Sequence, residues 1–374
     1  MTWDLIIVGA GLAGCSTAWH LAPHRRVLLL EQREQAGLEA SAQNAGMVRT
    51  LATDPVEQAL AIRSYRSIKN PPGDDWRQAP PFTQVGAILA GAEPMPNLQK
   101  AAAKIAEAGL RIEKRRATEL IEFAPAMAGS PVSDVWWMPE AGLADAHSLL
   151  QGFLRGARRQ GAELRTGVKI QGLQIDKGRA VGVQTEQGII YGGAVLLAAG
   201  AWSRSLAAGV GLERPLQPLA RHLLHTHPVP NINSAGHPYC WIDDVGIYIR
   251  PEAGGWLISP CDEQAVEPPL GGHSAGGVTD FGKAMTGDLL GRYFPQLAKA
   301  RFAGGWTGLR TFAPDRRPFL GPDPELTNLW WAAGLGGFGV TCSFAIGEVV
   351  SALMLGNNVD WLDTAAVDPG RTYL

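Results

Sequence analysis

Cysteine is scarce in this sequence, and the cysteines that are present form no recognisable pairs. The chain of 374 residues contains four of them, Cys15, Cys240, Cys261 and Cys342, widely separated and without a C-x-x-C motif. This spacing argues against a small scaffold held together by disulfides. We interpret the four residues as reduced thiols, as in a cytoplasmic enzyme.

An excess of charge of one sign is absent as well. Lysine and arginine number 33 against 35 aspartates and glutamates, and the formal net charge is −2. Proteins that bind nucleic acids or anionic membranes carry a basic face, so we expect neither partner. No apolar run reaches the length of a membrane span. The first predicted strand begins almost at Met1, so we also expect no cleavable leader.

What the chain does contain is a large apolar fraction, 46% of its residues, and a distinctive opening stretch. A short apolar run over residues 4–8 predicts a buried strand that leads directly into a G-x-G-x-x-G turn at residues 9–14. A helical pattern follows, and a second buried strand, Val27 to Leu30, ends at Glu31. This order of elements is typical of a dinucleotide-binding unit.

Each residue of this unit has a physical role. Gly9 permits the tight turn, Gly11 lets a pyrophosphate approach the backbone, and Gly14 lets the helix and the strand pack closely. The N-terminus of the helix offers free N–H groups and the positive end of its dipole to the phosphates. Glu31 is placed to accept hydrogen bonds from ribose hydroxyls and would repel a 2′-phosphate. The pattern therefore favours FAD or NAD over NADP.

The remainder of the chain alternates between two kinds of pattern. Helices are predicted at residues 55–68, 98–108, 147–160, 281–293 and 341–355. Strands are predicted at 85–89, 135–138, 194–199, 221–226, 240–242, 246–250, 255–259, 301–306 and 329–333, with a hairpin over 164–175 and 180–185. Residues 41–55 are rich in turn formers and are expected to form no element.

We therefore expect an α/β fold in which a substrate domain interrupts a nucleotide domain. The Rossmann-like nucleotide domain is predicted from three discontinuous segments, 1–81, 140–215 and 307–374. An α+β substrate domain with a large antiparallel sheet is predicted from residues 82–139 and 216–306. A second glycine-rich turn, Gly334 to Gly339, follows the last predicted strand.

Four motifs together resemble a known family. They are GAGLAG at 9–14 with Glu31, AAGAWS at 198–203, GLRTFAPDRRPFLG at 308–321, and GLGGFGVTCSFAIGE at 334–348. In this order they are similar to the FAD-dependent D-amino-acid oxidase, glycine oxidase and sarcosine oxidase superfamily. The stretches PLQPLARHLL, GIYIRPEAGGWLISP and WTGLRTFAPD resemble its D-arginine dehydrogenase branch most. The similarity extends along the whole chain.

The resemblance implies a Rossmann-like FAD-binding domain with FAD as the cofactor. The turn before Val340 is expected near the pyrimidine ring of the flavin, and the following helix directs its dipole at the N1–O2 edge. Where sarcosine oxidases attach the flavin to a cysteine, this chain has Gly308, so we expect non-covalent FAD. The implied cofactor-binding residues are Gly9, Gly11, Leu12, Ala13, Gly14, Glu31, Gln32, Arg33, Ser41, Asn44, Ala45, Gly46, Met47, Val168, Ala199, Gly200, Trp202, Arg310, Gly334, Gly336, Gly337, Phe338, Gly339, Val340 and Thr341.

The family also implies residues that hold the substrate. A planar guanidinium binds a carboxylate with two parallel hydrogen bonds, which fix its orientation as well as its affinity. Arg310 matches the arginine with this role, and Tyr248 matches a tyrosine that helps to hold the same carboxylate. Arg221 matches a further active-site arginine of the D-arginine dehydrogenase branch. Each residue also has an alternative structural interpretation. Arg310 could form a structural ion pair, Tyr248 could be a core aromatic residue, and Arg221 could be a cation on the sheet surface.

Three positions depart from the D-arginine dehydrogenase pattern. Gly86 stands where that branch has an acidic residue, and Met47 and Ala52 replace its histidine and lid tyrosine. Without the acid, the attraction for a substrate guanidinium is lost, and the pocket becomes less polar. An uncharged D-amino acid or a small secondary amine is therefore expected, although Arg49 in the same loop offers a partner for an acidic side chain.

The expected reaction is hydride transfer from the substrate α-carbon to flavin N5, giving an imino acid that hydrolyses to a 2-oxo acid and ammonia. The electron acceptor is a quinone, another carrier or O2. The alternatives are a sarcosine- or glycine-type amine oxidase, a 2-hydroxy-acid oxidase, a tRNA-wobble-modifying oxidoreductase and a non-catalytic flavoprotein.

Histidines raise the question of a metal site. His222, His225 and His227 lie close in sequence, but on a strand His222 points away from the other two, and no carboxylate or cysteine pattern accompanies them. We expect no metal. Asp145 is predicted to cap the helix that follows it, which leaves His147 as a reserve candidate for proton transfer.

Overall fold

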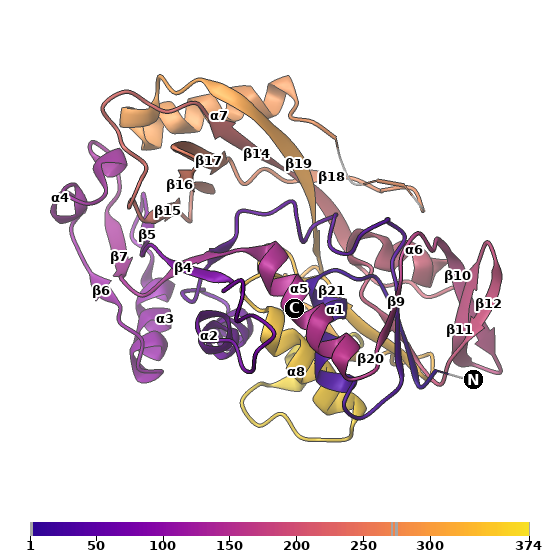
Figure 1. Ribbon diagram of the computed structural model, residues 1–374. Helices are drawn as coiled ribbons and strands as arrows, with labels where there is room; N and C mark the ends of the chain where they lie inside the picture. The colour runs from indigo at the N-terminus through magenta and orange to yellow at the C-terminus, as the bar shows by residue number, and fades with distance from the viewer. Residues whose placement is uncertain (1–2, 271, 274–275, 374) are drawn as a thin grey trace.

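A computed structural model describes residues 3–270, 272–273 and 276–373 (Figure 1). Its first layer is a six-stranded sheet with the order β20-β21-β13-β1-β2-β9. All neighbouring strands in it are parallel except β20 and β21. The bounds are β1 Leu5–Val8, β2 Val27–Leu30, β9 Glu163–Arg165, β13 Val195–Leu197, β20 Phe319–Pro322 and β21 Leu329–Ala333.

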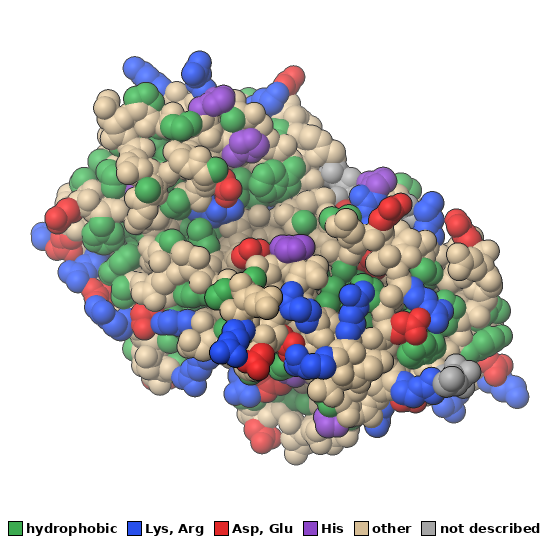
Figure 2. All heavy atoms as spheres, in the orientation of Figure 1, with side chains coloured by type: hydrophobic (Ala, Val, Ile, Leu, Met, Phe, Trp, Pro, Cys, Tyr) green, Lys and Arg blue, Asp and Glu red, His purple; other side chains and the backbone are tan. Residues whose placement is uncertain are grey.

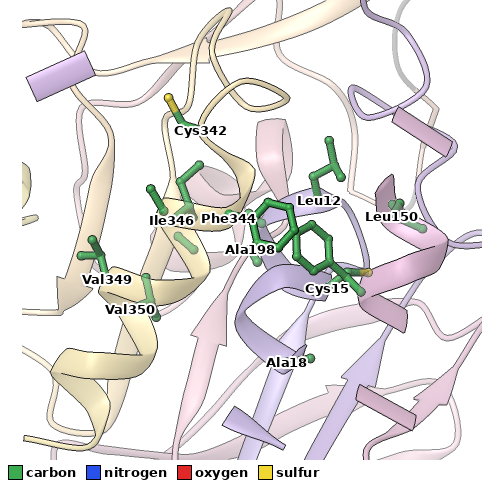
Figure 3. Packing of buried hydrophobic residues seen from close by; sticks show 14 of the residues in the cluster. Leu12, Cys15, Ala18, Leu150, Ala198, Cys342, Phe344, Ile346, Val349 and Val350 are labelled. Atoms are coloured by element: carbon green, nitrogen blue, oxygen red, sulfur yellow. The ribbon is translucent and has the colours of Figure 1, made fainter. Parts of the chain in front are cut away.

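Helices cover one face of this sheet. α1 (Leu12–Leu21) packs against α5 (Ala146–Arg159) and α8 (Ser343–Met354), and α2 (Pro55–Lys69) packs against α8. Figure 3 shows how the apolar side chains of α1 and α8 meet. The N-termini of α2 and α5 are capped by Asp54 and Asp145, whose carboxylates accept backbone N–H groups. The predicted cap at Asp145 is therefore confirmed, and capping accounts for this carboxylate.

The other face carries a small sheet and a short helix. Strands β10 (Ile170–Asp176), β11 (Arg179–Thr185) and β12 (Gly188–Tyr191) form an antiparallel sheet, and α6 (Ser203–Ala208) lies beside it. The hairpin between β10 and β11 is confirmed. Its predicted start was too early, because Gly167 has a φ of +69° and separates β9 from β10. The residues around Leu164 belong to the six-stranded sheet instead.

A second layer is a nine-stranded sheet with the order β18-β14-β17-β16-β15-β5-β7-β6, in which β19 pairs with the other edge of β14. The prediction of an antiparallel sheet holds except between β5 and β15, which are parallel. The bounds are β5 Ala87–Gly91, β6 Glu113–Lys114, β7 Asp134–Met138, β14 Gln217–Thr226, β15 Tyr239–Ile242, β16 Ile247–Glu252, β17 Gly255–Ser259, β18 Gln264–Ala265 and β19 Phe302–Phe312.

The two faces of the nine-stranded sheet have different environments. α7 (Asp280–Tyr293) lies across one face and buries an apolar cluster there. The opposite face carries a second apolar cluster that includes Tyr248 and Met47. α3 (Pro96–Glu107) packs on this second cluster, and α4 (Ala117–Leu120) follows β6 in the chain.

A third, small sheet is formed by β3 (Met47–Val48), β8 (Gly142–Ala144) and β4 (Phe82–Gln84). The expectation of no element over residues 41–55 is therefore wrong for β3. This strand is only two residues long, and its pairing with β8 across a long stretch of sequence leaves no local pattern. Within the described residues, short 3₁₀ turns lie at Pro125–Met127, Gly200–Trp202, Pro295–Leu297 and Thr364–Val367.

The two large sheets draw on different parts of the chain. The strands of the six-stranded sheet lie within residues 5–30, 163–165, 195–197 and 319–333, and those of the nine-stranded sheet lie within residues 87–138 and 217–312. The domain boundaries given above stay a prediction, and β19 runs without interruption across the one at 306/307. None of the helices in the described part of the chain has the length and apolar character needed to cross a bilayer.

Candidate cofactor and substrate site

A cavity of about 1290 Å³, including its opening to solvent, lies where β1, β13 and β21 end and β19 approaches them. The carboxyl ends of parallel strands are where open α/β sheets bind ligands. The predicted residues that line it are Gly9, Gly11, Leu12, Ala13, Glu31, Gln32, Ser41, Asn44, Ala199, Gly200, Trp202, Arg310, Gly334, Gly336, Gly337, Gly339 and Val340. The predicted residues outside its lining are Gly14, Arg33, Ala45, Gly46, Met47, Val168, Phe338, Thr341, Tyr248 and Arg221.

The glycines of the first turn differ in what surrounds them. A Cβ on Gly9, whose φ is +103°, would lie 2.5 Å from the Ala198 carbonyl oxygen, and one on Gly14 would lie 2.0 Å from the Gly9 oxygen. Gly11 has an extended backbone, and a Cβ there would meet only the Ser41 hydroxyl, at 3.1 Å. Gly9 and Gly14 thus fix the turn, whereas Gly11 leaves space towards the cavity.

The first turn of α1 suits an anion. Its N-cap Gly11 has no side chain, and no acidic residue lies within the first turn. The hydroxyl of Ser41, a residue of the cavity wall, accepts a hydrogen bond from the Leu12 N–H, with a donor–acceptor distance of 3.0 Å. A helix N-terminus that opens into a cavity, with no side chain on its cap residue, fits a dinucleotide pyrophosphate, because its free N–H groups and its dipole both favour negative charge.

Glu31 stands at the end of β2 and is nearly buried. One carboxylate oxygen accepts the Ala10 N–H at 3.0 Å, and the other accepts the Arg33 N–H at 2.9 Å. Burial raises the pKa of this carboxyl, and the two backbone donors act in the opposite direction. Arg33 forms an ion pair with Glu39 at 3.0 Å and also contacts His273. Glu31 therefore holds the glycine turn in place while it lines the cavity.

The second glycine-rich turn follows β21. Gly334 and Gly336 have φ values of +72° and +52°, and the Gly336 N–H donates to the Thr311 oxygen at 2.9 Å. The helix was expected to start near Val340, but α8 starts at Ser343. Thr341 lies in the turn instead, where its hydroxyl donates to the Met47 carbonyl at 3.1 Å.

Arg310 on β19 is the buried cation of the site. Its Nη1 donates to the Leu309 oxygen at 3.0 Å and its Nη2 to the Gln43 oxygen at 2.6 Å, and the residue is 7% exposed. No carboxylate in the described ranges lies within ion-pairing distance of it. Burial lowers the pKa of this guanidinium to about 10, from an ordinary value of 12.5. An unpaired buried cation that lines a cavity has a strong requirement for an anionic ligand.

Tyr248 and Arg221 lie close to Arg310. Burial raises the pKa of Tyr248, as does the neighbouring Cys261 thiol, whereas the two arginines lower it. Arg221 forms an ion pair with Glu263 at 2.8 Å, and it shares this carboxylate with Arg316. A Cβ on Gly337 would lie 3.8 Å from Arg221 Nη1, so this arginine approaches the second glycine turn. The three predicted substrate residues are thus brought together, although only Arg310 lines the cavity.

The departures noted in the sequence also have a structural setting. Gly86 has a φ of +78°, and a Cβ there would lie 2.2 Å from the Trp137 ring, so a larger residue does not fit without rearrangement. Met47 and Ala52 are buried. Arg49 was considered as a partner for an acidic substrate side chain, but its guanidinium already pairs with Asp243 at 2.9 Å.

His222 and His225 lie three residues apart on β14 and so point to opposite faces, as predicted, whereas His227 lies beyond the end of the strand. His222 is buried, and its Nδ1 lies 2.6 Å from an Asp262 oxygen, while its Nε2 lies 3.0 Å from the Thr279 hydroxyl. Asp262 is 40 residues away in sequence, so the spacing gave no sign of this carboxylate. Within the described ranges, no three His, Cys, Asp or Glu residues are arranged to hold a metal ion.

Sequence reasoning missed part of the cavity wall. Leu270 comes from the segment after β18, and Trp202 Nε1 donates to the Pro269 oxygen there at 3.0 Å. Contacts of this kind between distant loops have no local signal. The other residues missed are Val8, Leu30, Gly37, Leu38, Glu39, Ala40, Ile170, Ala198, Ala201, Leu206, Leu309, Thr311, Ala332, Ala333 and Leu335.

Charge is mixed on the surface as well as balanced in total. Lysine and arginine side chains intermingle with aspartate and glutamate on the face shown in Figure 2. This face therefore has no extended basic patch of the kind that nucleic-acid binding requires.

Comparison with known proteins gives one consistent result. The family model described as DAO, FAD dependent oxidoreductase, matches residues 4–353. The chain is 25% identical to human mitochondrial dimethylglycine dehydrogenase, over 98% of this chain and 44% of that protein. It is 26% identical to the D-amino acid dehydrogenase of Paramagnetospirillum magneticum, over 99% of both chains. The chain thus spans less than half the length of the dimethylglycine dehydrogenases it matches.

Solved structures share the fold. L-proline dehydrogenase from P. horikoshii superposes with a TM-score of 0.84 at 22% identity, covering 98% of this chain and 97% of that one. Glycine oxidase from Geobacillus kaustophilus superposes with a TM-score of 0.80 at 21% identity, covering all of both chains.

Proposed function

Because this chain belongs to the DAO family of FAD-dependent oxidoreductases, we propose that it oxidises a small D-amino acid with an uncharged side chain. The products are the imino acid, which water hydrolyses to a 2-oxo acid and ammonia, and a reduced enzyme. The electrons pass on to a quinone, another carrier or O2. The D-amino acid dehydrogenase of Paramagnetospirillum magneticum, which matches along its full length, supports this substrate class.

FAD is the cofactor of this family, and the cavity residues suit it. Gly11 and the open first turn of α1 would hold the pyrophosphate, and Glu31 would accept the ribose hydroxyls. The cavity lining contains no cysteine, histidine or tyrosine within the described residues, which supports non-covalent attachment. When bound, FAD supplies a two-electron acceptor that takes a hydride from the substrate.

Arg310 is the observation that carries the proposal. It is buried, it lines the cavity, and its hydrogen bonds go to neutral carbonyls, so its charge is left for an anion. A substrate carboxylate supplies that anion and accepts two N–H groups in a fixed orientation. A carboxylate held in this way fixes the position of the adjacent α-carbon.

The neighbouring residues complete the site. Burial raises the pKa of Tyr248, and its hydroxyl can donate a further hydrogen bond to the carboxylate beside those from Arg310. The apolar cluster that contains Tyr248 also contains Met47, Leu223 and Leu257, and it offers an uncharged surface to the substrate side chain. Orientation and exclusion of water are then the main contributions of the protein, and no strong base is required when the amine reacts in its neutral form.

A second candidate is an N-methylated amino acid. It keeps the carboxylate that Arg310 requires, and the similarity to human dimethylglycine dehydrogenase and to 4-methylaminobutanoate oxidase of Paenarthrobacter nicotinovorans favours it. The uncharged wall around Tyr248 accepts a methylated amine without a new charged contact.

The test is anaerobic reduction of the bound flavin, which is measured as the loss of its visible absorbance. The panel contains D-amino acids, their L forms, N-methyl amino acids and 2-hydroxy acids. We expect reduction by uncharged D-amino acids that is fast in the wild type and strongly impaired in Arg310→Met. Reduction by 2-hydroxy acids alone, or by no member of the panel, would overturn the proposal.

A further inference from the structure

We propose that the ion pair between Arg49 and Asp243, stacked between Trp241 and Phe338, is a charge filter that restricts the substrate to uncharged side chains. The inference rests on the proposed amino-acid oxidation. It assigns a specificity role to residues that lie beside the site but outside the cavity lining.

The guanidinium of Arg49 is enclosed on both faces. Its Cζ lies 4.2 Å from the centre of the Trp241 ring and 4.3 Å from the centre of the Phe338 ring. Its Nη1 lies 2.9 Å from Asp243 Oδ1, and the two side chains are 12% and 23% exposed. A guanidinium with both faces stacked and one edge paired has little freedom to turn towards a substrate.

The stack adjoins the substrate residues. Trp241 and Tyr248 face each other on neighbouring strands, with ring centres 5.0 Å apart. Phe338 lies between Gly337 and Gly339, both of which line the cavity. The Trp241 ring therefore contacts both Arg49 and the tyrosine that would hold the substrate carboxylate.

The backbone fixes the same arrangement. The Arg49 N–H donates to the Thr341 hydroxyl at 3.2 Å, which ties the loop before α2 to the second glycine turn. Trp241 packs on the apolar cluster around Tyr248 and Met47. The stack therefore lies against the apolar cluster that contains Tyr248, and it joins the end of β15 to the loop before α2 and to the second glycine turn.

Intact, the pair presents no net charge to the site. A charged substrate side chain would have to compete for one partner and leave the other partly buried without a counter-ion, which is strongly unfavourable. Glu57 and Arg316 are further charged groups nearby, and Glu57 lines a small cavity together with Phe338. Burial raises the pKa of the Glu57 carboxyl to about 7, and Arg49 acts in the opposite direction. A neutral side chain disturbs none of these groups.

The experiment uses three variants of the FAD-loaded protein. Asp243→Asn releases the Arg49 guanidinium, so we expect relative kcat/KM for D-glutamate over D-alanine to rise roughly tenfold or more. Arg49→Met releases the Asp243 carboxylate, so we expect a similar rise for D-lysine. The double variant Arg49→Met with Asp243→Leu should show neither the rise for D-glutamate nor the rise for D-lysine. Arg63→Gln, which removes an exposed ion pair with Glu348 on the helical side, is the matched control.

A binding measurement accompanies the kinetics. Butyrate and glutarate are not oxidised, and their binding is followed through the change in flavin absorbance. We expect the affinity for glutarate to rise relative to the affinity for butyrate only in Asp243→Asn. The inference is overturned by the following combination of results. The wild type oxidises D-alanine, but both single variants have the same relative kcat/KM for charged substrates and the same ratio of glutarate to butyrate affinity as the wild type. A wild type that no amino acid reduces would instead count against the proposed function.

Discussion

The Nη2 of Arg310 donates a hydrogen bond to the carbonyl oxygen of Gln43 at 2.6 Å. This bond joins β19 of the nine-stranded sheet to the loop that follows β2 of the six-stranded sheet. Gly308 stands beside it, and a Cβ there would lie only 2.8 Å from the same oxygen. Glycine at 308 therefore lets the loop approach closely enough to orient the Arg310 side chain.

Arg310→Lys keeps the positive charge but loses the planar fork, and Arg310→Met loses both. We expect Arg310→Met to weaken carboxylate binding by roughly 2–4 kcal/mol, which is about 30- to 1000-fold, and Arg310→Lys by less. Binding of butyrate, followed by flavin absorbance, measures the effect. FAD content is measured alongside, because Arg310 also lines the cofactor cavity. An unchanged butyrate affinity in FAD-loaded Arg310→Met would contradict the assigned role.

The pH dependence of carboxylate binding follows from the same residue. Burial lowers the pKa of the Arg310 guanidinium to about 10 in the free protein. The ligand binds the protonated form, so affinity should be constant below pH 10 and fall about tenfold for each pH unit above it. Butyrate titrations from pH 8 to pH 11 measure this. A constant affinity up to pH 11 would show that the guanidinium keeps its ordinary pKa.

Gly11→Ala separates cofactor binding from folding. A Cβ at Gly11 meets only the Ser41 hydroxyl at 3.1 Å, so the chain should fold. Gly11 lines the cavity, so the added methyl group should interfere with the pyrophosphate that we propose to bind there. We expect FAD affinity to fall by roughly 1–3 kcal/mol, about 5- to 150-fold.

Fluorescence titration of the apoprotein with FAD measures this change. Gly287→Ala on the exposed side of α7 has no atom within 4 Å of its new methyl group and is the control. This control should bind FAD normally and unfold at an equal or higher temperature, because alanine favours a helix. Normal FAD affinity in Gly11→Ala would contradict the proposal that the first turn of α1 binds the pyrophosphate.

Arg214→Met tests a structural ion pair. Arg214 donates to both oxygens of Asp323, at 3.0 Å and 2.8 Å, and the Asp323 side chain is fully buried. Removing the guanidinium leaves a buried carboxylate, so we expect the protein to lose about 3–5 kcal/mol of stability. Thermal unfolding of the FAD-saturated protein measures the loss. Arg63→Met, at an exposed pair, should cost less than about 1 kcal/mol; equal effects would contradict the distinction.

Local signals predicted much of the fold. The run into Gly9, the acidic end of β2 and the cap at Asp145 each depend on residues adjacent in sequence, and each is found where it was expected. The sequence also led us to expect Arg310, Tyr248 and Arg221 close together. That expectation came from resemblance to a family and not from a local signal.

The features that were missed depend on contacts between distant segments. Asp243 was not recognised as the partner of Arg49, because 194 residues separate them. The parallel pairing of β5 with β15 joins two segments that have no common pattern. The helix after the second glycine turn was expected from Thr341, but α8 starts at Ser343, and the Thr341 hydroxyl bonds to the distant Met47 carbonyl, a contact that the sequence of the turn does not reveal.

The parallel neighbour of β5 has a consequence for biosynthesis. β5 is fully buried in the finished protein, but β15, which covers one of its edges, emerges only after residues 92–238 have been made. At about 5–20 residues per second, this edge stays uncovered for roughly 7–30 s on the ribosome. During that time the nascent chain presents an apolar strand edge on which chaperones can act, and Arg310 and Gly334, which line the cofactor cavity, are still to be synthesised.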